Sequence, residues 1–291
     1  MKRNAIAFVL VLALAAASAA SARAADAPTV LFPAAFSVEH QLVQTDADTT
    51  SFRTDPVTDT YGGSLLVSVR PGGSRVIVDF ARRTVTEVSV ERSTYCTLSF
   101  SQMGELSRRL ARADERPSAA SATSPRASNA AIEQDIRVEE VSDGGRDRLA
   151  APGAPASRAG ARRFRAFVEN GLSADVWVDE TVRLSPAALD ALESFEKDAL
   201  GSGDAPAVST ARLVNAARRA ADGAVPVRVR RPLSSAGGVV EDVVTSLTPL
   251  PAFPQKLFVI GDGFRRVPSP LEVMVAFAEE EASRDSSRLV K

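Results

Sequence analysis

The sequence is poor in the residues that catalysis and metal binding most often need. Its 291 residues include one cysteine and one histidine. A single cysteine excludes a disulfide framework and any multi-cysteine zinc or iron–sulfur site. A single histidine excludes multi-histidine metal sites and severely restricts histidine-dependent catalysis. The composition therefore argues against most classes of enzyme, and we expect no metal and no cofactor.

The chain also lacks an excess of charge of either sign. It has 35 Lys and Arg residues against 36 Asp and Glu residues, a formal net charge of −1. This balance gives no electrostatic basis for binding nucleic acid. Hydrophobic residues make up 45% of the chain, which is enough to build a core.

The N-terminus has the pattern of a secretory signal over residues 1–24. Lys2 and Arg3 precede an apolar run from Ala5 to Ala17, and Ala22-Arg23-Ala24 supplies small residues for cleavage before Ala25. The run is short for a membrane span, which takes about 20 residues, and no later stretch is longer. We expect residues 25–291 to form one domain that does not span a membrane, in the periplasm of a Gram-negative-type bacterium or secreted from it.

Alternating apolar and polar residues predict many short strands, and apolar residues at 3–4 spacing predict a few helices. A Ser-Pro start and a following glycine mark a helix after residue 185. These signals indicate the α+β class with an antiparallel meander. The predicted strands are 36–43, 65–69, 76–80, 84–90, 95–100, 132–141, 164–168, 175–178, 182–184, 225–230, 239–247 and 256–260; the predicted helices are 102–113, 185–201, 210–222 and 271–282.

Two stretches contain almost no large apolar residues. Residues 115–131 and 143–161 are rich in Ser, Ala, Pro, Gly and Arg. Such composition leaves little to offset the entropy of ordering the chain. We interpret both as flexible insertions in the domain.

The candidate chemical groups are few. His40 falls inside a predicted strand and no G-x-S-x-G motif occurs, so a structural or surface role is favoured over catalysis. Cys96 is interpreted as a small buried hydrophobe. The Asp-rich stretch 46–59 does not match the calcium-binding loop of an EF-hand, because Ser51 and Val57 stand where Gly and Glu are required. It is interpreted as a solvated loop. Four arginine pairs are interpreted as solvated strand ends and helix faces: Arg82-Arg83, Arg162-Arg163, Arg218-Arg219 and Arg230-Arg231.

Several segments, in their order along the chain, resemble an uncharacterised family of secreted bacterial domains related to the LolA/LolB lipoprotein carriers. The likeness covers most of residues 36–268, although Ile260-Gly261 stands where members usually have Ile-Pro. The segments are Arg75–Phe80, Arg82–Thr86, Ser93–Phe100, Asp175–Val178, Val227–Thr245 and Lys256–Phe264.

This resemblance implies a half-open antiparallel β-barrel of the LolA type, with helices on its concave side. In carriers of that fold the concavity holds acyl chains, and the family brings no catalytic residues to transfer. A helix over 102–113 would place Met103, Leu106 and Leu110 toward the concavity as pocket-lining residues, although such apolar stripes also fill ordinary cores.

Three functions remain open at this stage. The leading hypothesis is a non-enzymatic periplasmic protein that binds an apolar or amphipathic ligand, such as a lipid or lipoprotein. The alternative is an envelope scaffold, a protein-interaction module whose barrel is filled. A hydrolase ranks last, because the motifs for one are missing.

The signal peptide gives the first testable prediction. Protein recovered from its native host should begin at Ala25, because Ala22 and Ala24 meet the small-residue requirement of the peptidase. N-terminal sequencing of the soluble envelope fraction checks this. A chain that starts at Met1 in the membrane fraction would contradict the predicted localisation.

Overall fold

A computed structural model describes most of the domain expected after the signal. The described residues are 30–45, 51–114, 135–142, 161–169, 172–199, 210–232, 238–268 and 270. The predicted signal, the predicted insertions apart from residue 161, and the predicted helix over 271–282 lie outside them.

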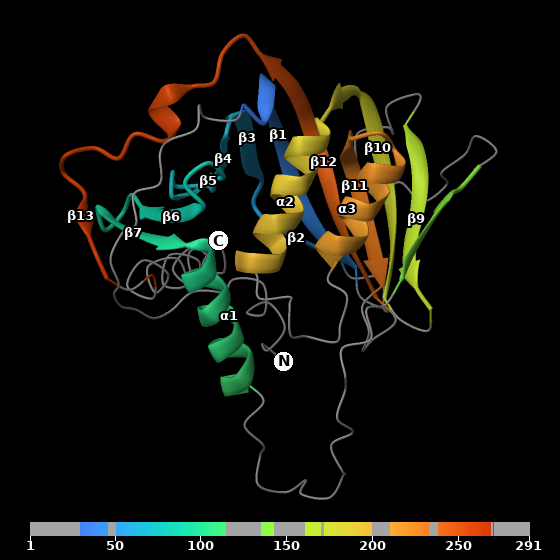
Figure 1. The fold of residues 1–291 in the computed structure, drawn as a ribbon, viewed down its shortest axis with the longest axis horizontal. Helices are drawn as coiled ribbons and strands as arrows, with labels where there is room; N and C mark the ends of the chain where they lie inside the picture. Colours follow the sequence, from blue (N-terminus) through green and yellow to red (C-terminus); the bar gives the residue numbers. More distant parts are fainter. Residues whose placement is uncertain are drawn as a thin grey trace, which may run out of the picture.

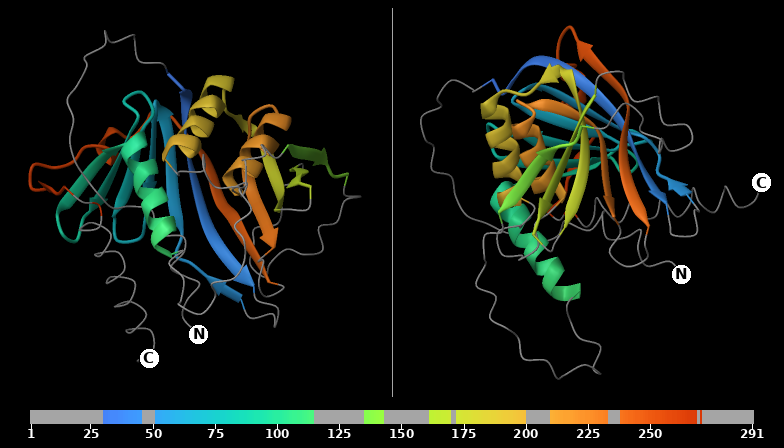
Figure 2. Two further views of the ribbon diagram at one scale, coloured as in Figure 1. Left: turned by 60° about the horizontal axis from the view of Figure 1, so that its bottom comes forward. Right: turned by 90° about the vertical axis from the view of Figure 1, so that its right-hand side faces the viewer.

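Most strands predicted from alternation are present and join into one curved sheet (Figures 1 and 2). Within the described residues the sheet has 13 strands. They are β1 (Phe32–Thr45), β2 (Ser51–Arg53), β3 (Val57–Gly63), β4 (Leu65–Val69), β5 (Arg75–Asp79), β6 (Thr84–Ser89), β7 (Thr94–Ser99), β8 (Ile136–Glu140), β9 (Arg162–Val168), β10 (Ser173–Arg183), β11 (Ala224–Pro232), β12 (Val239–Leu250) and β13 (Arg265–Arg266).

The sheet is antiparallel almost throughout, as the meander predicted. Its order is β13-β7-β6-β5-β4-β3-β1-β12-β11-β10-β9-β8, with β2 paired to β1 beside this path. Only the short β13 runs parallel to its neighbour, β7. The strands at the two ends of the path, β13 and β8, do not pair with each other, so the sheet is open and does not close into a barrel.

Three helices lie along one side of the sheet (Figure 2). They are α1 (Phe100–Asp114), α2 (Pro186–Ala199) and α3 (Thr210–Ala220). The predicted start of α2 is confirmed: the Ser185 hydroxyl accepts a hydrogen bond from the Ala188 N–H at 3.1 Å, and Pro186 is the first helical residue.

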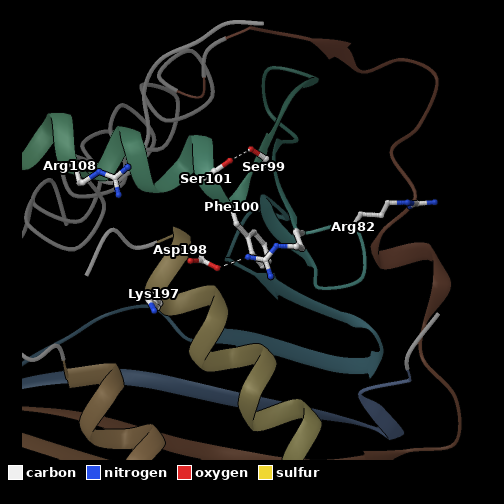
Figure 3. A pocket seen from close by; sticks show the side chains of 8 residues that line it. Arg82, Ser99, Phe100, Ser101, Arg108, Lys197 and Asp198 are labelled. Carbon is white, nitrogen blue, oxygen red and sulfur yellow. Dashed lines mark hydrogen bonds and ion pairs between the residues drawn. The ribbon is translucent and has the colours of Figure 1, made fainter. Parts of the chain in front are cut away.

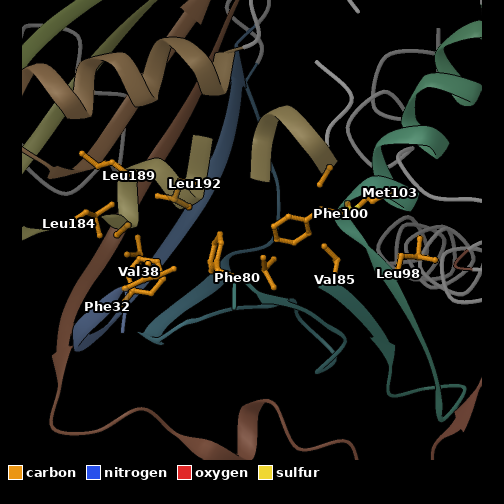
Figure 4. Packing of buried hydrophobic residues seen from close by; sticks show 14 of the residues in the cluster. Phe32, Val38, Phe80, Val85, Leu98, Phe100, Met103, Leu184, Leu189 and Leu192 are labelled. Carbon is orange, nitrogen blue, oxygen red and sulfur yellow. The ribbon is translucent and has the colours of Figure 1, made fainter. Parts of the chain in front are cut away.

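The main core lies between the sheet and helices α1 and α2 (Figure 4). Phe80, Phe100 and Phe195 meet edge to face at its centre, with ring centroids 5.0–6.4 Å apart. A second cluster lies between α3 and strands β8–β11. Both clusters use one face of the sheet, and together they occupy the side on which the resemblance placed a ligand concavity.

The chain after β12 departs from the sequence prediction. Residues 256–260 were expected to form a strand, but they contain a 3-10 helix (Gln255–Leu257) followed by irregular backbone. The apolar side chains around it pack on Val67, Ile77 and Val88, on the sheet face opposite the helices. Partial burial without strand pairing explains why an apolar run was mistaken for a strand.

One buried carboxyl interrupts the core under β6. Glu87 is 6% exposed, and its cross-strand partners are Val76 and Cys96. Burial raises the pKa of Glu87 to about 7, although the charge of Arg70 opposes the shift. An ionised carboxylate without compensating hydrogen bonds is costly at such a site.

Glu87 therefore predicts the sign of a pH dependence. Because the folded pKa is raised from 4.5, the folded chain binds more protons than the unfolded chain between about pH 4.5 and 7. Stability should fall as the pH rises through this window, by about 3 kcal/mol if the shift is expressed in full. Urea unfolding at pH 5 and pH 8 measures this fall, and Glu87→Gln should reduce it. An equal fall in the variant would show that other groups cause it.

Candidate functional site

A cleft opens where three parts of the chain meet (Figure 3). Its volume is ≈ 570 Å³, within the range of ligand pockets. The turn between β5 and β6, the start of α1 and the end of α2 each contribute side chains. The lining residues are Arg82, Arg83, Ser99, Phe100, Ser101, Arg108, Lys197 and Asp198.

The cleft depends on a close crossing of α1 and α2. A Cβ atom on Gly104 would lie 2.0 Å from the Asp198 carbonyl oxygen, so only glycine permits this approach. One turn later, the Ser107 hydroxyl lies 3.2 Å from the Ala199 carbonyl oxygen and donates to it. These contacts fix the end of α2, and with it Lys197 and Asp198, against α1.

The start of α1 forms another wall of the cleft. The Ser99 hydroxyl accepts a hydrogen bond from the Gln102 N–H at 3.2 Å, and the Gln102 side chain accepts one from the Ser99 N–H at 2.8 Å. This reciprocal pair is a capping box. It sets the positive end of the helix dipole beside the cleft.

Arg83 bridges the sheet and α2 across the cleft. Its backbone has φ 53°, the left-handed conformation of a tight turn, and its carbonyl accepts the Phe100 N–H at 2.9 Å. Its guanidinium donates to the Asp198 carboxylate and, at 3.2 Å, to the Ser194 hydroxyl. The same group lies over the Phe100 ring, 5.3 Å from the ring centre.

The charge of the lining is strongly one-sided. Four cationic residues and one carboxylate line it, a net charge of +3, whereas the whole chain carries −1. Arg82 pairs with Asp79 at 3.4 Å and its side chain points away from the cleft (Figure 3), so the cations that face it are Arg83, Arg108 and Lys197. Phe100 forms the floor but is only 2% exposed, because the aromatic core packs beneath it. The arrangement suits a compact anionic group held near the surface, since planar guanidinium groups bind carboxylates and phosphates well.

Other arginine pairs named from the sequence are engaged elsewhere. Arg162 pairs with Glu140 and Glu180, and Arg219 pairs with Asp190 and Glu193. Among the pairs singled out, Arg82-Arg83 contributes to the cleft. The cleft could therefore hardly be predicted from the sequence, because its cationic residues come from distant segments and do not form a recognisable motif.

Two of the three residues predicted to line a pocket, Met103 and Leu106, do not line this cleft. Met103 and Leu106 are 6% and 1% exposed and belong to the main core cluster. Leu110 also lies in α1, but its side chain is outside the described ones. Their proposed contact with a ligand stays a prediction.

His40 lies on β1 between two carboxylates. Its Nδ1 is 2.9 Å from Asp242 Oδ1 and its Nε2 is 3.5 Å from Asp59 Oδ2. Burial alone would lower the pKa of His40, but Asp242 and Asp59 outweigh it and raise the pKa to about 10. A charged imidazole with both nitrogens facing carboxylates cannot act as a general base near neutral pH.

This placement corrects part of the sequence interpretation. Asp59 was assigned to a solvated loop, but it lies in β3 and faces His40. Strand β3 was not predicted because its sequence contains too few apolar residues to show the alternation of a half-buried strand. Above it on α3, Arg218 donates to the Asn215 side chain at 3.0 Å, and Asn215 donates to Glu196 of α2 at 3.1 Å.

Cys96 and the acidic residues are the remaining candidate groups. Cys96 is 3% exposed in the core, as a small buried hydrophobe should be. In the part of the chain that the structure describes, no group of three or more His, Cys, Asp or Glu side chains is arranged to hold a metal ion.

None of the described helices is both long and apolar enough to cross a bilayer.

Comparison with known proteins gives limited information. No family model matches the chain, and no curated protein matches it. An uncharacterized conserved protein from Thermus thermophilus aligns with a TM-score of 0.37 and 6% identity, over 80% of this chain and 90% of that one. A LolA superfamily protein from Nitrosomonas europaea aligns with a TM-score of 0.29 and 11% identity, over 80% and 93%.

The second structure bears the superfamily name to which the sequence resemblance points. At TM-scores below 0.5, neither structure carries an argument about this chain. Family membership therefore stays a prediction, and the function has to be argued from the site itself.

The ion cluster around His40 gives a prediction about stability. His40→Gln removes a cation and leaves Asp59 and Asp242 without it, so the variant should lose about 1–3 kcal/mol of unfolding free energy. Because the folded pKa of His40 is raised, its contribution is full below pH 6.5 and is lost as the pH rises toward 10.

Urea unfolding at pH 6 and pH 10 tests both statements. The wild-type advantage over His40→Gln should shrink at the higher pH. Adding Asp242→Asn to the variant should recover part of the loss at pH 6, since it removes one uncompensated charge. No recovery would argue against the ion cluster as the cause.

Proposed function

We propose that this chain is a non-enzymatic binding protein of the bacterial periplasm, and that its ligand is an anionic amphiphile such as a lipid or a lipidated molecule. The cationic cleft over Phe100 is the observation that carries the proposal. Arg83, Arg108, Lys197 and the capped start of α1 lie around a volume of ≈ 570 Å³. The location in the periplasm rests on the predicted signal peptide.

The packing of the core determines which part of the ligand the protein would hold. Phe80, Phe100, Met103 and Leu106 are buried in one cluster beneath the cleft, so an acyl chain would have to displace packed side chains to enter there. The charged head group is the part that the cleft suits. The proximal part of the apolar chain would then lie along the mouth, against the aliphatic stem of Arg108.

A binding role without catalysis is supported by the state of the candidate reactive groups. His40 is charged and enclosed by carboxylates, and Cys96 is buried in the core. A nucleophile would need an activating base near it, and a thiolate would need a cationic neighbour. The cleft itself offers two serine hydroxyls but no histidine to activate them.

A scaffold function is the second candidate, and a specific observation favours it. The helix-covered face of the sheet is filled by two apolar clusters among the described residues, as expected of a module whose barrel interior is packed. In that case the basic cleft would bind an acidic segment of a protein partner. Native mass spectrometry of protein purified from its own host separates the two, because a carrier should bring lipid and a scaffold should bring a protein.

Binding of a defined amphiphile tests the leading proposal. Isothermal titration calorimetry in low salt should detect octyl phosphate but not the uncharged octyl glucoside. Affinity should fall as salt is added, since the attraction is between exposed charges. Arg108→Gln should weaken binding about fivefold, equivalent to about 1 kcal/mol.

The matched control is Arg92→Gln, which removes an exposed arginine from the turn between β6 and β7, outside the lining. It should leave affinity within about twofold of the wild type. Equal weakening by both variants would mean that net charge, and not the cleft, drives binding. Absence of octyl phosphate binding would overturn the proposed function.

A further inference from the structure

Among the lining residues that the structure describes, Asp198 is the one carboxylate, and the others are cationic or neutral. A site that only attracted anions would gain from its absence, because it repels every anionic ligand. Its side chain is 36% exposed and faces the cleft beside Arg83 (Figure 3). The position of this group therefore bears on which anions the cleft accepts.

The backbone of Asp198 cannot retreat from the cleft. Its carbonyl lies against Gly104, and the next residue, Ala199, accepts a hydrogen bond from Ser107. Moreover, a negative charge in the last turn of α2 interacts unfavourably with the helix dipole, so the helix itself gains nothing from it. The carboxylate is held where it is by Arg83 and by Ser194, whose hydroxyl lies 3.1 Å from Asp198 Oδ2.

An ionised carboxylate accepts hydrogen bonds and donates none. Its two oxygens offer about four acceptor positions, so Asp198 can accept a further hydrogen bond from a ligand in the cleft. Such a ligand must combine negative charge, for the surrounding cations, with an O–H that points to Asp198. A sulfate ester, a phosphodiester and an ionised carboxylate all lack that donor.

A phosphomonoester has both properties when it is singly charged. Its second ionisation lies near pH 6, so below that pH one oxygen carries a proton. An O–H donating to a carboxylate forms a strong, charge-assisted hydrogen bond. An anion without this proton cannot form that hydrogen bond and still meets a carboxylate, whose charge Arg83 offsets in part. A site can reject a competitor of similar size in this way.

We infer that Asp198 makes the cleft select phosphomonoesters over sulfate esters, by accepting a hydrogen bond from the protonated phosphate. This inference rests on the proposed function and specifies the head group of the ligand. The other cations of the lining hold the remaining phosphate oxygens. The phosphate group would come from a lipid head group or from free phosphate, which share this chemistry.

The experiment compares octyl phosphate with octyl sulfate by calorimetry at pH 5.5 in low salt. At this pH both are mainly single anions of similar size, and they differ in the P–OH donor. The wild type should bind octyl phosphate at least fivefold more tightly than octyl sulfate. In Asp198→Asn the preference should fall below twofold, because the carboxylate acceptor and its repulsion are both removed.

Glu193→Gln is the matched control. It removes a carboxylate from the same helix, where Glu193 pairs with Arg219 away from the cleft, and it should keep the wild-type preference. The melting temperatures of both variants show whether they fold. The absence of a preference in the wild type needs no variant to interpret, so it overturns the inference even if Asp198→Asn fails to fold.

Each outcome has a defined meaning. Equal wild-type affinity for the two esters, or a preference that survives in folded Asp198→Asn, overturns the inference and leaves the proposed function standing. Binding of neither ester overturns both. The last measurement uses inorganic phosphate as the ligand. If it binds more weakly than octyl phosphate, the phosphate group of the natural ligand belongs to a lipid-like molecule. If it binds equally, the natural ligand is free phosphate, and the inference about Asp198 is supported in either case.

Discussion

The contact between α1 and the end of α2 at Gly104 is the constraint on which the site depends. Two helices can approach until backbone touches backbone only where one of them has no side chain. Here the Asp198 carbonyl lies where a Cβ of Gly104 would be. The approach brings the last turn of α2 beside the first turns of α1, and the β5–β6 turn joins them through Arg83. Three segments far apart in the sequence thereby form one cationic surface.

The same packing explains why the interior offers little room to a ligand. The faces of α1 and α2 that point to the sheet are filled by aromatic and aliphatic side chains, with Leu106 at 1% exposure. On the same face of the sheet lies an ionic cluster around His40, Asp59 and Asp242. Charges held in this way are stable only in mutual contact, so apolar chains would not readily replace them.

Much of the fold could be predicted from the sequence because it depends on local patterns. Alternation in Leu65–Val69 predicted β4 to the residue, and the Ser-Pro start of α2 follows from capping chemistry. The secondary-structure prediction failed where an apolar segment packs on the sheet without pairing in it, and where a polar segment pairs in the sheet. Leu257, Phe258 and Ile260 are apolar because they pack on the outer face of the sheet. In contrast, β3 is polar although it pairs on both sides. Neither fact is visible in a single segment.

The site was beyond the reach of sequence reasoning for a related reason. Arg82, Arg108 and Lys197 look like ordinary surface residues, and only the fold brings them together. The shape of the cleft also limits how it could hold the proposed ligand. Because the floor at Phe100 is closed by the core, binding energy must come mainly from charge and hydrogen bonds at the mouth, where water and salt weaken them. Under the proposed function, the ligand would therefore be held by contacts that weaken as salt is added.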